Sequence, residues 1–269
     1  MFFFTLKTTN MQTKKVIKHI VNWLKEYADN ANIDGFVLGI SGGIDSAVTS
    51  TLCAMTGKKV ICLNLPIHQA PNQIERSNNH IDWLKNNFET ISSEIVDLTA
   101  TFDQTCNDFP SQIQDELTMA NVRARLRMTT IYAFAGHHKY LVAGTGNKVE
   151  DFGVGFFTKY GDGGVDLSPI ADLMKSDVFE IAKELNVIDS IQKAKPTDGL
   201  WGDDRNDEDQ IGASYPELEW AMNYLEKKPE KDLNERKKEV LKIYERLNRI
   251  NQHKMIPIPV CEIPEEFLS

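Results

Sequence analysis

Several kinds of pattern are scarce or missing in this chain of 269 residues, and each absence narrows its function. The four cysteines stand far apart with no CxxC pair, which indicates neither a zinc site nor a disulfide framework. They are Cys53, Cys62, Cys106 and Cys261. No apolar run approaches the length of a membrane span, and Met1-Phe2-Phe3-Phe4 is too short for a signal peptide. We expect a cytoplasmic protein with no membrane partner.

Excess positive charge is missing as well. The chain carries 30 lysines and arginines against 39 aspartates and glutamates, which gives a formal net charge of -9. Because nucleic-acid binding depends on broad basic surfaces, this balance argues against a nucleic-acid partner, although it leaves room for a local basic pocket. The hydrophobic share of 41% and the charged share of 26% are typical of a globular domain.

No internal repeat and no strong linker divides the chain. Its length would suit one large α/β domain or two small ones. We expect a single domain over residues 13–269, preceded by a disordered leader at 1–12, in which Met11 offers an alternative start of translation.

Apolar runs of strand length alternate with stretches of helical periodicity. Strands are expected at 35–40, 59–65, 91–98 and 140–143. One helix is expected at 13–29, before the first strand, and a second in the segment that follows that strand. Further helices are expected at 71–88, 112–136, 175–185, 215–226 and 231–252. This order predicts an α/β fold with a doubly wound, Rossmann-like parallel sheet and helices on both faces. We expect an ordered loop with a short strand at 152–173 and a mobile lid at 195–212.

The first strand leads into the most informative segment, Ser41-Gly42-Gly43-Ile44-Asp45-Ser46. Adjacent glycines allow a positive φ and a close approach of the backbone to a ligand. A helix follows, so unpaired N–H groups and the positive end of the helix dipole face this turn. The pattern indicates a phosphate site. It is not a Walker A loop, because no Gly-Lys-Ser/Thr follows. The alternative is an ordinary strand–turn–helix joint.

A second polar segment, 144–151, follows the strand expected at 140–143. In a parallel sheet it would place Thr145 and Glu150 beside the first glycine turn. Mg²⁺ prefers one or two carboxylates together with phosphate oxygens and water, and Asp45 and Glu150 could supply that pair. The alternative is that Glu150 only stabilises the N-terminus of a helix.

A third segment, 155–166, combines aromatic residues with Lys159 and Asp162 between glycines. Such a loop can offer a stacking surface, a cation and a carboxylate, or it can be a structural loop with an aromatic plug.

Arginines recur in the fourth segment, 121–128. Arg123 and Arg127 share one helical face, while Arg125 points elsewhere. A solvated basic face is the simplest interpretation. The alanine, leucine and methionine between the arginines also allow a paired or anion-binding arginine.

Together these segments resemble the ammonia-dependent NAD synthetases, which are ATP pyrophosphatases with an adenine nucleotide alpha hydrolase-like fold. The resemblance extends from about residue 13 to residue 260. The Ser-Gly-Gly-x-Asp-Ser turn is shared with other ATP pyrophosphatases. Narrower to this family are Phe-Phe-Thr-Lys-Tyr-Gly-Asp-Gly-Gly at 156–164, Asn-x-x-Ala-Arg-x-Arg-Met at 121–128, Pro196-Thr197 and His253-Lys254.

The resemblance implies a role for each matching position. ATP would be bound by Gly39, Ile40, Ser41, Gly42, Gly43, Ile44, Asp45, Ser46, Leu65, Thr145, Lys175 and Thr197. Deamido-NAD would be bound by Arg125, Tyr132, Lys159, Asp166, His253 and Lys254. Mg²⁺ would be bound by Asp45 and Glu150, with Asp151 as the alternative because one extra residue separates Glu150 from Gly155. Catalysis would depend on Asp45, Asp162 and Lys175.

The same resemblance implies the reaction and the partners. The expected reaction amidates deamido-NAD with ammonia and converts ATP to AMP and pyrophosphate through an adenylated carboxylate. The expected assembly is a homodimer with the dinucleotide at the subunit interface, near the 112–136 helix. Ammonia is the expected nitrogen donor, since the chain has no room for an amidase domain. The alternatives are an ATP pyrophosphatase that modifies tRNA bases, a GMP synthetase-like enzyme, and an ATP-binding sensor without chemistry.

Overall fold

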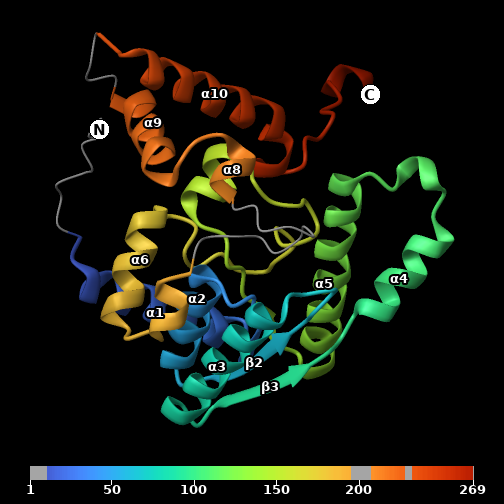
Figure 1. The fold of residues 1–269 in the computed structure, drawn as a ribbon, viewed down its shortest axis with the longest axis vertical. Helices are drawn as coiled ribbons and strands as arrows, with labels where there is room; N and C mark the ends of the chain where they lie inside the picture. Colours follow the sequence, from blue (N-terminus) through green and yellow to red (C-terminus); the bar gives the residue numbers. More distant parts are fainter. Residues whose placement is uncertain (1–10, 195–206, 228–231, 269) are drawn as a thin grey trace.

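The fold is built around one parallel sheet, in a computed structural model that describes residues 11–194, 207–227 and 232–268 (Figure 1). Its strands are β1 (Gly35–Gly39), β2 (Lys59–Asn64), β3 (Ile91–Ile95) and β4 (Leu141–Val142). They lie in the order β3-β2-β1-β4, and every pairing is parallel. The chain therefore winds outward from β1 in one direction through β2 and β3, and in the other direction to β4. This arrangement confirms the predicted doubly wound α/β fold.

Alternating side chains of the strands build two separate cores. Phe36 and Leu38 of β1 belong to the core on one face, while Val37 belongs to the core on the other. The first face is covered by helices α1 (Thr13–Asn30), α2 (Ile44–Met55), α3 (Pro71–Asn87) and α6 (Lys175–Glu184), and the second by α4 (Thr99–Asp108) and α5 (Glu116–His138). Burial on both faces explains why β1 and β2 are continuously apolar in sequence.

The C-terminal helices form a separate layer, which lies beyond the carboxyl edge of the sheet in Figure 1. Helices α8 (Asp207–Ile211), α9 (Tyr215–Lys227) and α10 (Glu235–Met255) surround a third apolar cluster. That cluster includes Val149 and Val154 of the π-helical turn η2 (Val149–Val154), which follows β4. We call this layer, residues 207–227 and 232–255, the C-terminal lobe. It packs on the segment after β4 rather than on the strands.

Shorter elements complete the described chain. They are η1 (Ser111–Ile113), α7 (Asp189–Gln192) and η3 (Glu265–Phe267). No helix in the described ranges is both long and apolar enough to cross a membrane.

The structure corrects several predicted boundaries. The helix expected from 112 begins at Glu116, where the Asp115 side chain accepts from the Thr118 N–H at 3.0 Å and caps it. Helix α10 starts at Glu235, not at 231, with Asn234 as its cap. Helix α4 was not predicted, because its composition is mostly polar.

The other differences concern strands and loops. The third strand ends at Ile95, before the expected limit of 98. The short strand expected within 152–173 is reduced to one bridge between Ala143 and Leu167. The start of that stretch belongs to η2. The predicted leader falls outside the described residues up to residue 10, and the predicted lid does so over 195–206.

Candidate active site

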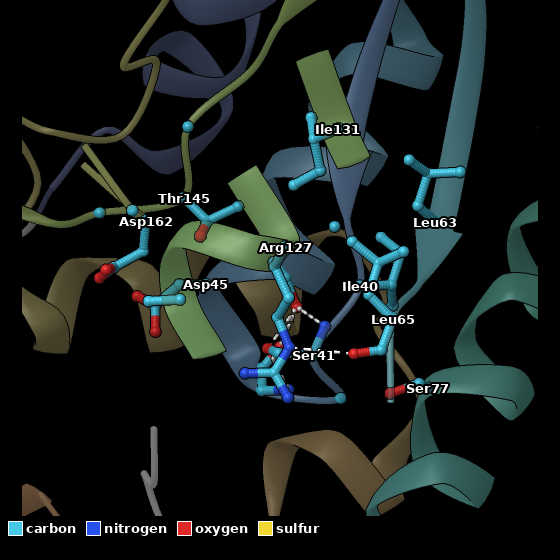
Figure 2. A pocket seen from close by; sticks show the side chains of 18 of the residues that line it. Ile40, Ser41, Asp45, Leu63, Leu65, Ser77, Arg127, Ile131, Thr145 and Asp162 are labelled. Atoms are coloured by element: carbon cyan, nitrogen blue, oxygen red, sulfur yellow. Dashed lines mark hydrogen bonds between the residues drawn. The ribbon is translucent and has the colours of Figure 1, made fainter. Parts of the chain in front are cut away.

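A cavity of about 270 Å³ opens at the carboxyl ends of β1, β2 and β4. In a doubly wound sheet this is the point where the winding direction changes, and ligands bind there. Figure 2 shows Asp45, Thr145 and Asp162 at one end of the cavity, and Leu63, Leu65 and Ser77 at the other. The lining also includes every predicted ATP-site residue that the structure describes, namely Gly39, Ile40, Ser41, Gly42, Gly43, Ile44, Asp45, Ser46, Leu65, Thr145 and Lys175. Thr197 lies outside the described residues.

The glycine turn is shaped by its own hydroxyl groups. Ser46 Oγ donates to the Gly43 carbonyl at 3.0 Å, and Ser41 Oγ accepts from the Gly43 N–H at 3.2 Å. Gly42 has a φ of +80°, and a Cβ at this position would lie 3.0 Å from Ser77 Oγ of α3. Both the backbone conformation and the lack of space therefore require glycine here. Helix α2 begins directly afterwards at Ile44, so its first N–H groups have no acceptor within the helix.

Three charged side chains meet beside this turn. Lys175, the first residue of α6, places Nζ 2.6 Å from Asp45 Oδ2 and 2.8 Å from Glu150 Oε1. The lysine is only 3% exposed, so both ion pairs are shielded from water. The triad brings together residues after β1, after β4 and at the start of α6. We call it the Asp45–Lys175–Glu150 triad.

Sharing one ammonium between two carboxylates moves all three pKa values. Burial and the charge of Glu150 raise the pKa of Asp45, although Lys175 opposes them. Burial would raise the pKa of Glu150 as well, but the charge and hydrogen bond of Lys175 lower it. The pKa of Lys175 is raised, because the attraction of two carboxylates exceeds the effect of burial. With both carboxylates ionised, the triad carries a net negative charge.

Asn147 positions two members of this triad. It is fully buried, and its Nδ2 donates to Asp45 Oδ1 at 3.1 Å. Its Oδ1 accepts from the N–H groups of Val149 and Glu150, at 3.1 and 3.2 Å, which caps η2. The sequence singled out this segment but not Asn147. An asparagine two residues before a turn is a capping signal that could have identified it.

Further acids line the same side of the cavity. Burial, together with Glu150, Asp162 and Asp45, raises the pKa of Asp151 to about 8. Asp162 opens onto the cavity with an exposed side chain, and its Oδ1 accepts from the Thr158 N–H at 2.9 Å. Desolvation by the surrounding protein raises the pKa of Asp162, although this hydrogen bond opposes the shift. Of the two candidate metal ligands, Glu150 converges with Asp45, whereas Asp151 packs against Gly146.

The carboxylates do not form a complete metal cage. In the three described ranges, no group of three or more His, Cys, Asp and Glu side chains is arranged to hold a metal ion. A divalent ion here would need additional oxygens from a substrate, which is how proteins commonly bind Mg²⁺ with ATP.

Arg127 lines the cavity, although the sequence pattern did not distinguish it from the other arginines of its helix. It reaches from α5 to the carbonyl of Leu65, to which Nε donates at 2.9 Å (Figure 2). Its second nitrogen donates to Gln69 Oε1 at 2.8 Å. Arg127 thus fixes the segment after β2 and is the paired arginine that the sequence allowed. Arg123, one turn earlier, lies over the ring of Phe102 at 4.3 Å.

The six predicted deamido-NAD residues lie outside the cavity lining and fall into two groups. In the first, Arg125 donates to the Lys159 carbonyl at 3.3 Å, and Lys159 Nζ donates to the His253 carbonyl at 2.5 Å. Lys254 Nζ donates to the Phe157 carbonyl at 2.6 Å. These bonds join α5, the 155–166 loop and the end of α10. We call Arg125, Lys159, His253 and Lys254 the basic cluster.

The second group is a pair at the start of β4. Tyr132 of α5 donates to Asp166 Oδ1 at 3.0 Å, and Asp166 Oδ2 accepts from the Val142 N–H at 2.8 Å. Burial and this bond to Asp166 raise the pKa of Tyr132 to about 12. Asp166 therefore supports the sheet edge and is separate from the basic cluster in its contacts.

The predictions from the sequence included neither Tyr215 nor Asp207. The Tyr215 hydroxyl lies 2.5 Å from Glu150 Oε1 and 3.1 Å from Asp207 Oδ2. No local pattern could have found them, because the contact joins positions 65 residues apart through the packing of the C-terminal lobe.

Comparison with known proteins agrees with this geometry. The sequence model of the family described as NAD synthase matches residues 16–257. The NH(3)-dependent NAD(+) synthetase of Methanosarcina acetivorans is 34% identical over 262 residues, which covers 94% of this chain and all of that protein.

Solved structures agree as well. The NMN synthetase of Francisella tularensis has a TM-score of 0.80 at 30% identity, covering 95% of this chain and 99% of that one. The NH3-dependent NAD synthetase of Campylobacter jejuni has a TM-score of 0.77 at 25% identity, covering 94% and 100%. These matches confirm the resemblance inferred from the motifs: the chain belongs to the NAD synthase family.

Proposed function

We propose that the protein amidates deamido-NAD with ammonia, using ATP and Mg²⁺, and releases NAD, AMP and pyrophosphate. It is thus a ligase that forms a carbon–nitrogen bond. The observation that carries this proposal is the Asp45–Lys175–Glu150 triad beside a glycine turn and a helix N-terminus, in a chain of the NAD synthase family. These groups offer an anion cradle and a cation next to two carboxylates, which suits the departure of pyrophosphate.

The first half-reaction activates the nicotinate carboxylate. One carboxylate oxygen attacks the α-phosphorus of ATP, and the bond between the α-phosphorus and the bridging oxygen breaks. The leaving pyrophosphate gains negative charge, which the N–H groups at the start of α2 and the ammonium of Lys175 can stabilise. Burial of the triad strengthens these electrostatic interactions.

Asp45 and Glu150 are the residues that would hold Mg²⁺. The ammonium of Lys175 already lies where the two carboxylates converge, so a cation fits this position. Burial, and after it the negative charges of the neighbouring carboxylates, raise the pKa of the adjacent Asp151 to about 8, and a bound cation would reduce that excess of negative charge. When bound, Mg²⁺ would neutralise the charge that develops on the departing phosphates.

The second half-reaction needs ammonia at the acyl carbon of the adenylate. Ammonia attacks, AMP leaves with the oxygen that was adenylated, and a proton must be taken up from the attacking nitrogen. Asp162 is our candidate to accept it, since this carboxylate faces the cavity and partial desolvation there raises its pKa. Lys159 of the basic cluster lies on the same loop as Asp162, and the cluster would bind the phosphates of the acceptor.

One alternative acceptor is supported by a specific observation. The structural relative from Francisella tularensis is described as an NMN synthetase, which implies a mononucleotide product for that protein. The equivalent reaction here would amidate nicotinate mononucleotide through the same adenylate chemistry. The basic cluster favours the dinucleotide, because its several cations suit an acceptor with two phosphates.

Product analysis distinguishes these possibilities. Purified protein is incubated with ATP, Mg²⁺ and ammonium, together with either deamido-NAD or nicotinate mononucleotide, and the nucleotides are separated by chromatography. We expect equal amounts of NAD and AMP with deamido-NAD, and a lower kcat/KM with the mononucleotide. A higher kcat/KM with the mononucleotide would establish the alternative. AMP without either amide would contradict both, and no AMP would favour an ATP sensor.

We also propose a homodimer. Large apolar side chains are exposed on the C-terminal tail, including Ile258 at 66%, Val260 at 80% and Leu268 at 73%. Exposed apolar surface of this density is typical of an interface. Light scattering should therefore give the mass of a dimer for the full chain, and removal of residues after 255 should shift it toward the monomer. A full-length monomer would contradict the proposal.

A cytoplasmic location is proposed on chemical grounds. ATP and the pyridine nucleotides are available there, and the free cysteines of the described chain, among them the buried Cys53 and Cys62, are compatible with a reducing compartment.

A further inference from the structure

The C-terminal lobe contacts the triad through one buried side chain. Tyr215 opens α9 and is 5% exposed. Its hydroxyl lies 2.5 Å from Glu150 Oε1, the same oxygen that accepts from Lys175 Nζ at 2.8 Å. Its ring centroid lies 4.7 Å from Lys175 Nζ. Two members of the triad therefore contact the same residue.

Glu150 depends on this contact for its position. Its backbone belongs to the short π-helical turn η2, and glutamate has three rotatable side-chain bonds. Lys175 holds one carboxylate oxygen from α6, and Tyr215 holds the same oxygen from α9. Two donors from two different elements fix a flexible side chain far better than one, because both must move before the carboxylate can turn.

Asp207 competes for the same hydroxyl. Asp207 is 5% exposed, and its Oδ2 lies 3.1 Å from the Tyr215 oxygen. A phenol has a single proton to donate. The shorter distance assigns that proton to Glu150, at 2.5 Å. This asymmetry distinguishes Tyr215 from a tyrosine that is buried only for packing, whose hydroxyl could satisfy either acid.

We propose that Tyr215 is a positioning residue that acts through Glu150 to preserve its geometry for a divalent cation bound with ATP. The proposal rests on the proposed function only in the identity of the bound nucleotide and metal. Its consequence is that loss of the hydroxyl weakens metal binding more than acceptor binding.

Tyr215→Phe removes the hydroxyl and keeps the ring. Mn²⁺ serves as the probe, and its free fraction is measured by electron paramagnetic resonance in the presence of an ATP analogue with a methylene bridge between the α and β phosphates. We expect the dissociation constant for Mn²⁺ to rise by about ten-fold to a hundred-fold, the usual loss for the outer partner of a metal ligand. In turnover, the Mg²⁺ requirement should rise while the KM for deamido-NAD changes by less than about two-fold.

Tyr244→Phe is the matched control. Tyr244 is also buried in the apolar cluster of the C-terminal lobe, and it packs against η2 at Gly153. We expect this variant to bind Mn²⁺ as the unmodified protein does. Unchanged Mn²⁺ affinity in both tyrosine variants would overturn the proposal. An equal loss of affinity in both would also overturn it, since that would indicate a general effect of the C-terminal lobe.

Two further variants separate positioning from packing. In a Glu150→Gln background, Tyr215→Phe should have no additional effect on Mn²⁺ affinity, whereas additive losses would show that Tyr215 does not act through Glu150. Asp207→Asn leaves the phenol in place and removes the competing acceptor charge, so Mn²⁺ affinity should stay equal or increase. A loss of Mn²⁺ affinity of about ten-fold or more in Asp207→Asn would overturn the proposal. This outcome can be read even if Tyr215→Phe proves too unstable to measure.

The binding measurement is independent of the reaction. If the protein bound Mn²⁺ with the analogue but made no NAD, the proposed function would fail while the role of Tyr215 could still be decided.

Discussion

The two halves of the candidate site are built in different ways. The phosphate half, formed by the glycine turn and the Asp45–Lys175–Glu150 triad, follows two neighbouring strands and is mostly buried. The acceptor half, formed by the 155–166 loop and the basic cluster, joins a loop to two helix surfaces through bonds to backbone carbonyls. The sheet topology fixes the first half, whereas the second half requires the C-terminal lobe to be docked. Substitutions should therefore affect the two halves differently.

The largest effect is expected from Asp45→Asn. This change keeps the shape of the side chain and removes a charge from the triad. We expect kcat to fall on the order of 10²–10³, as when a preorganised charge contact is lost. The measurement is turnover at saturating Mg²⁺, with circular dichroism as the check of folding. A folded variant with normal activity would contradict the metal role.

The support behind the glycine turn should respond to pH. His80 of α3 is fully buried, and its Nε2 lies 3.0 Å from Ser50 Oγ of α2, the helix that begins at the turn. Ser50 donates to the Ala47 carbonyl at 3.0 Å, so the histidine donates from Nε2. Nδ1 is buried with no hydrogen-bond partner in the described structure. Burial lowers the pKa of His80 from 6.5 to about 4.

This shift predicts a loss of stability in acid. Between pH 6.5 and about 4 the unfolded chain binds a proton at His80 that the folded chain excludes. The contribution of neutral His80 to the free energy of unfolding is therefore complete above pH 6.5 and is lost as the pH falls toward 4. The total is at most about 3 kcal/mol, from 1.36 kcal/mol per pKa unit. Urea unfolding across this range should show that the free energy of unfolding decreases as the pH falls. His80→Gln should reduce the slope of that dependence on pH. An unchanged slope in His80→Gln would show that other groups cause it.

The smallest effect is expected in the acceptor half. Lys159→Ala removes a cation of the basic cluster and leaves the triad intact. We expect the KM for deamido-NAD to rise about ten-fold, the value of a hydrogen bond to a charged group, with little change in the KM for ATP. Lys238→Ala is the control, because Lys238 makes an exposed ion pair with Glu235 on α10 and is no member of the basic cluster. Equal increases in both KM values would contradict the separation of the two halves.

The same contrast explains what could be predicted from the sequence. Strand patterns and parallel topology placed Asp45, Thr145 and Glu150 at one edge of the sheet, because residues that follow neighbouring parallel strands must lie together. The glycines that require special backbone conformations, such as Gly42, were recognisable for the same local reason. The main fold and the phosphate half therefore followed from short-range rules.

Contacts with the C-terminal lobe could not be predicted in this way. Tyr215 and Asp207 reach the triad only because α9 and α10 pack on η2, and a π-helical turn has no simple sequence signature. The ion pair of Lys175 with both carboxylates was also unforeseen. The resemblance indicated that Lys175 contacts ATP and takes part in catalysis, while the geometry shows which protein charges hold it. Tertiary packing determines these contacts.

The central claim is that the phosphate half adenylates a carboxylate of the acceptor. The most direct test uses deamido-NAD whose carboxylate carries a heavy isotope of oxygen, with ATP, Mg²⁺ and ammonium, followed by mass spectrometry of the products. We expect one labelled oxygen in the phosphate of AMP and none in pyrophosphate, because the attacking oxygen leaves with AMP. Unlabelled AMP, or label in inorganic phosphate together with ADP, would contradict it.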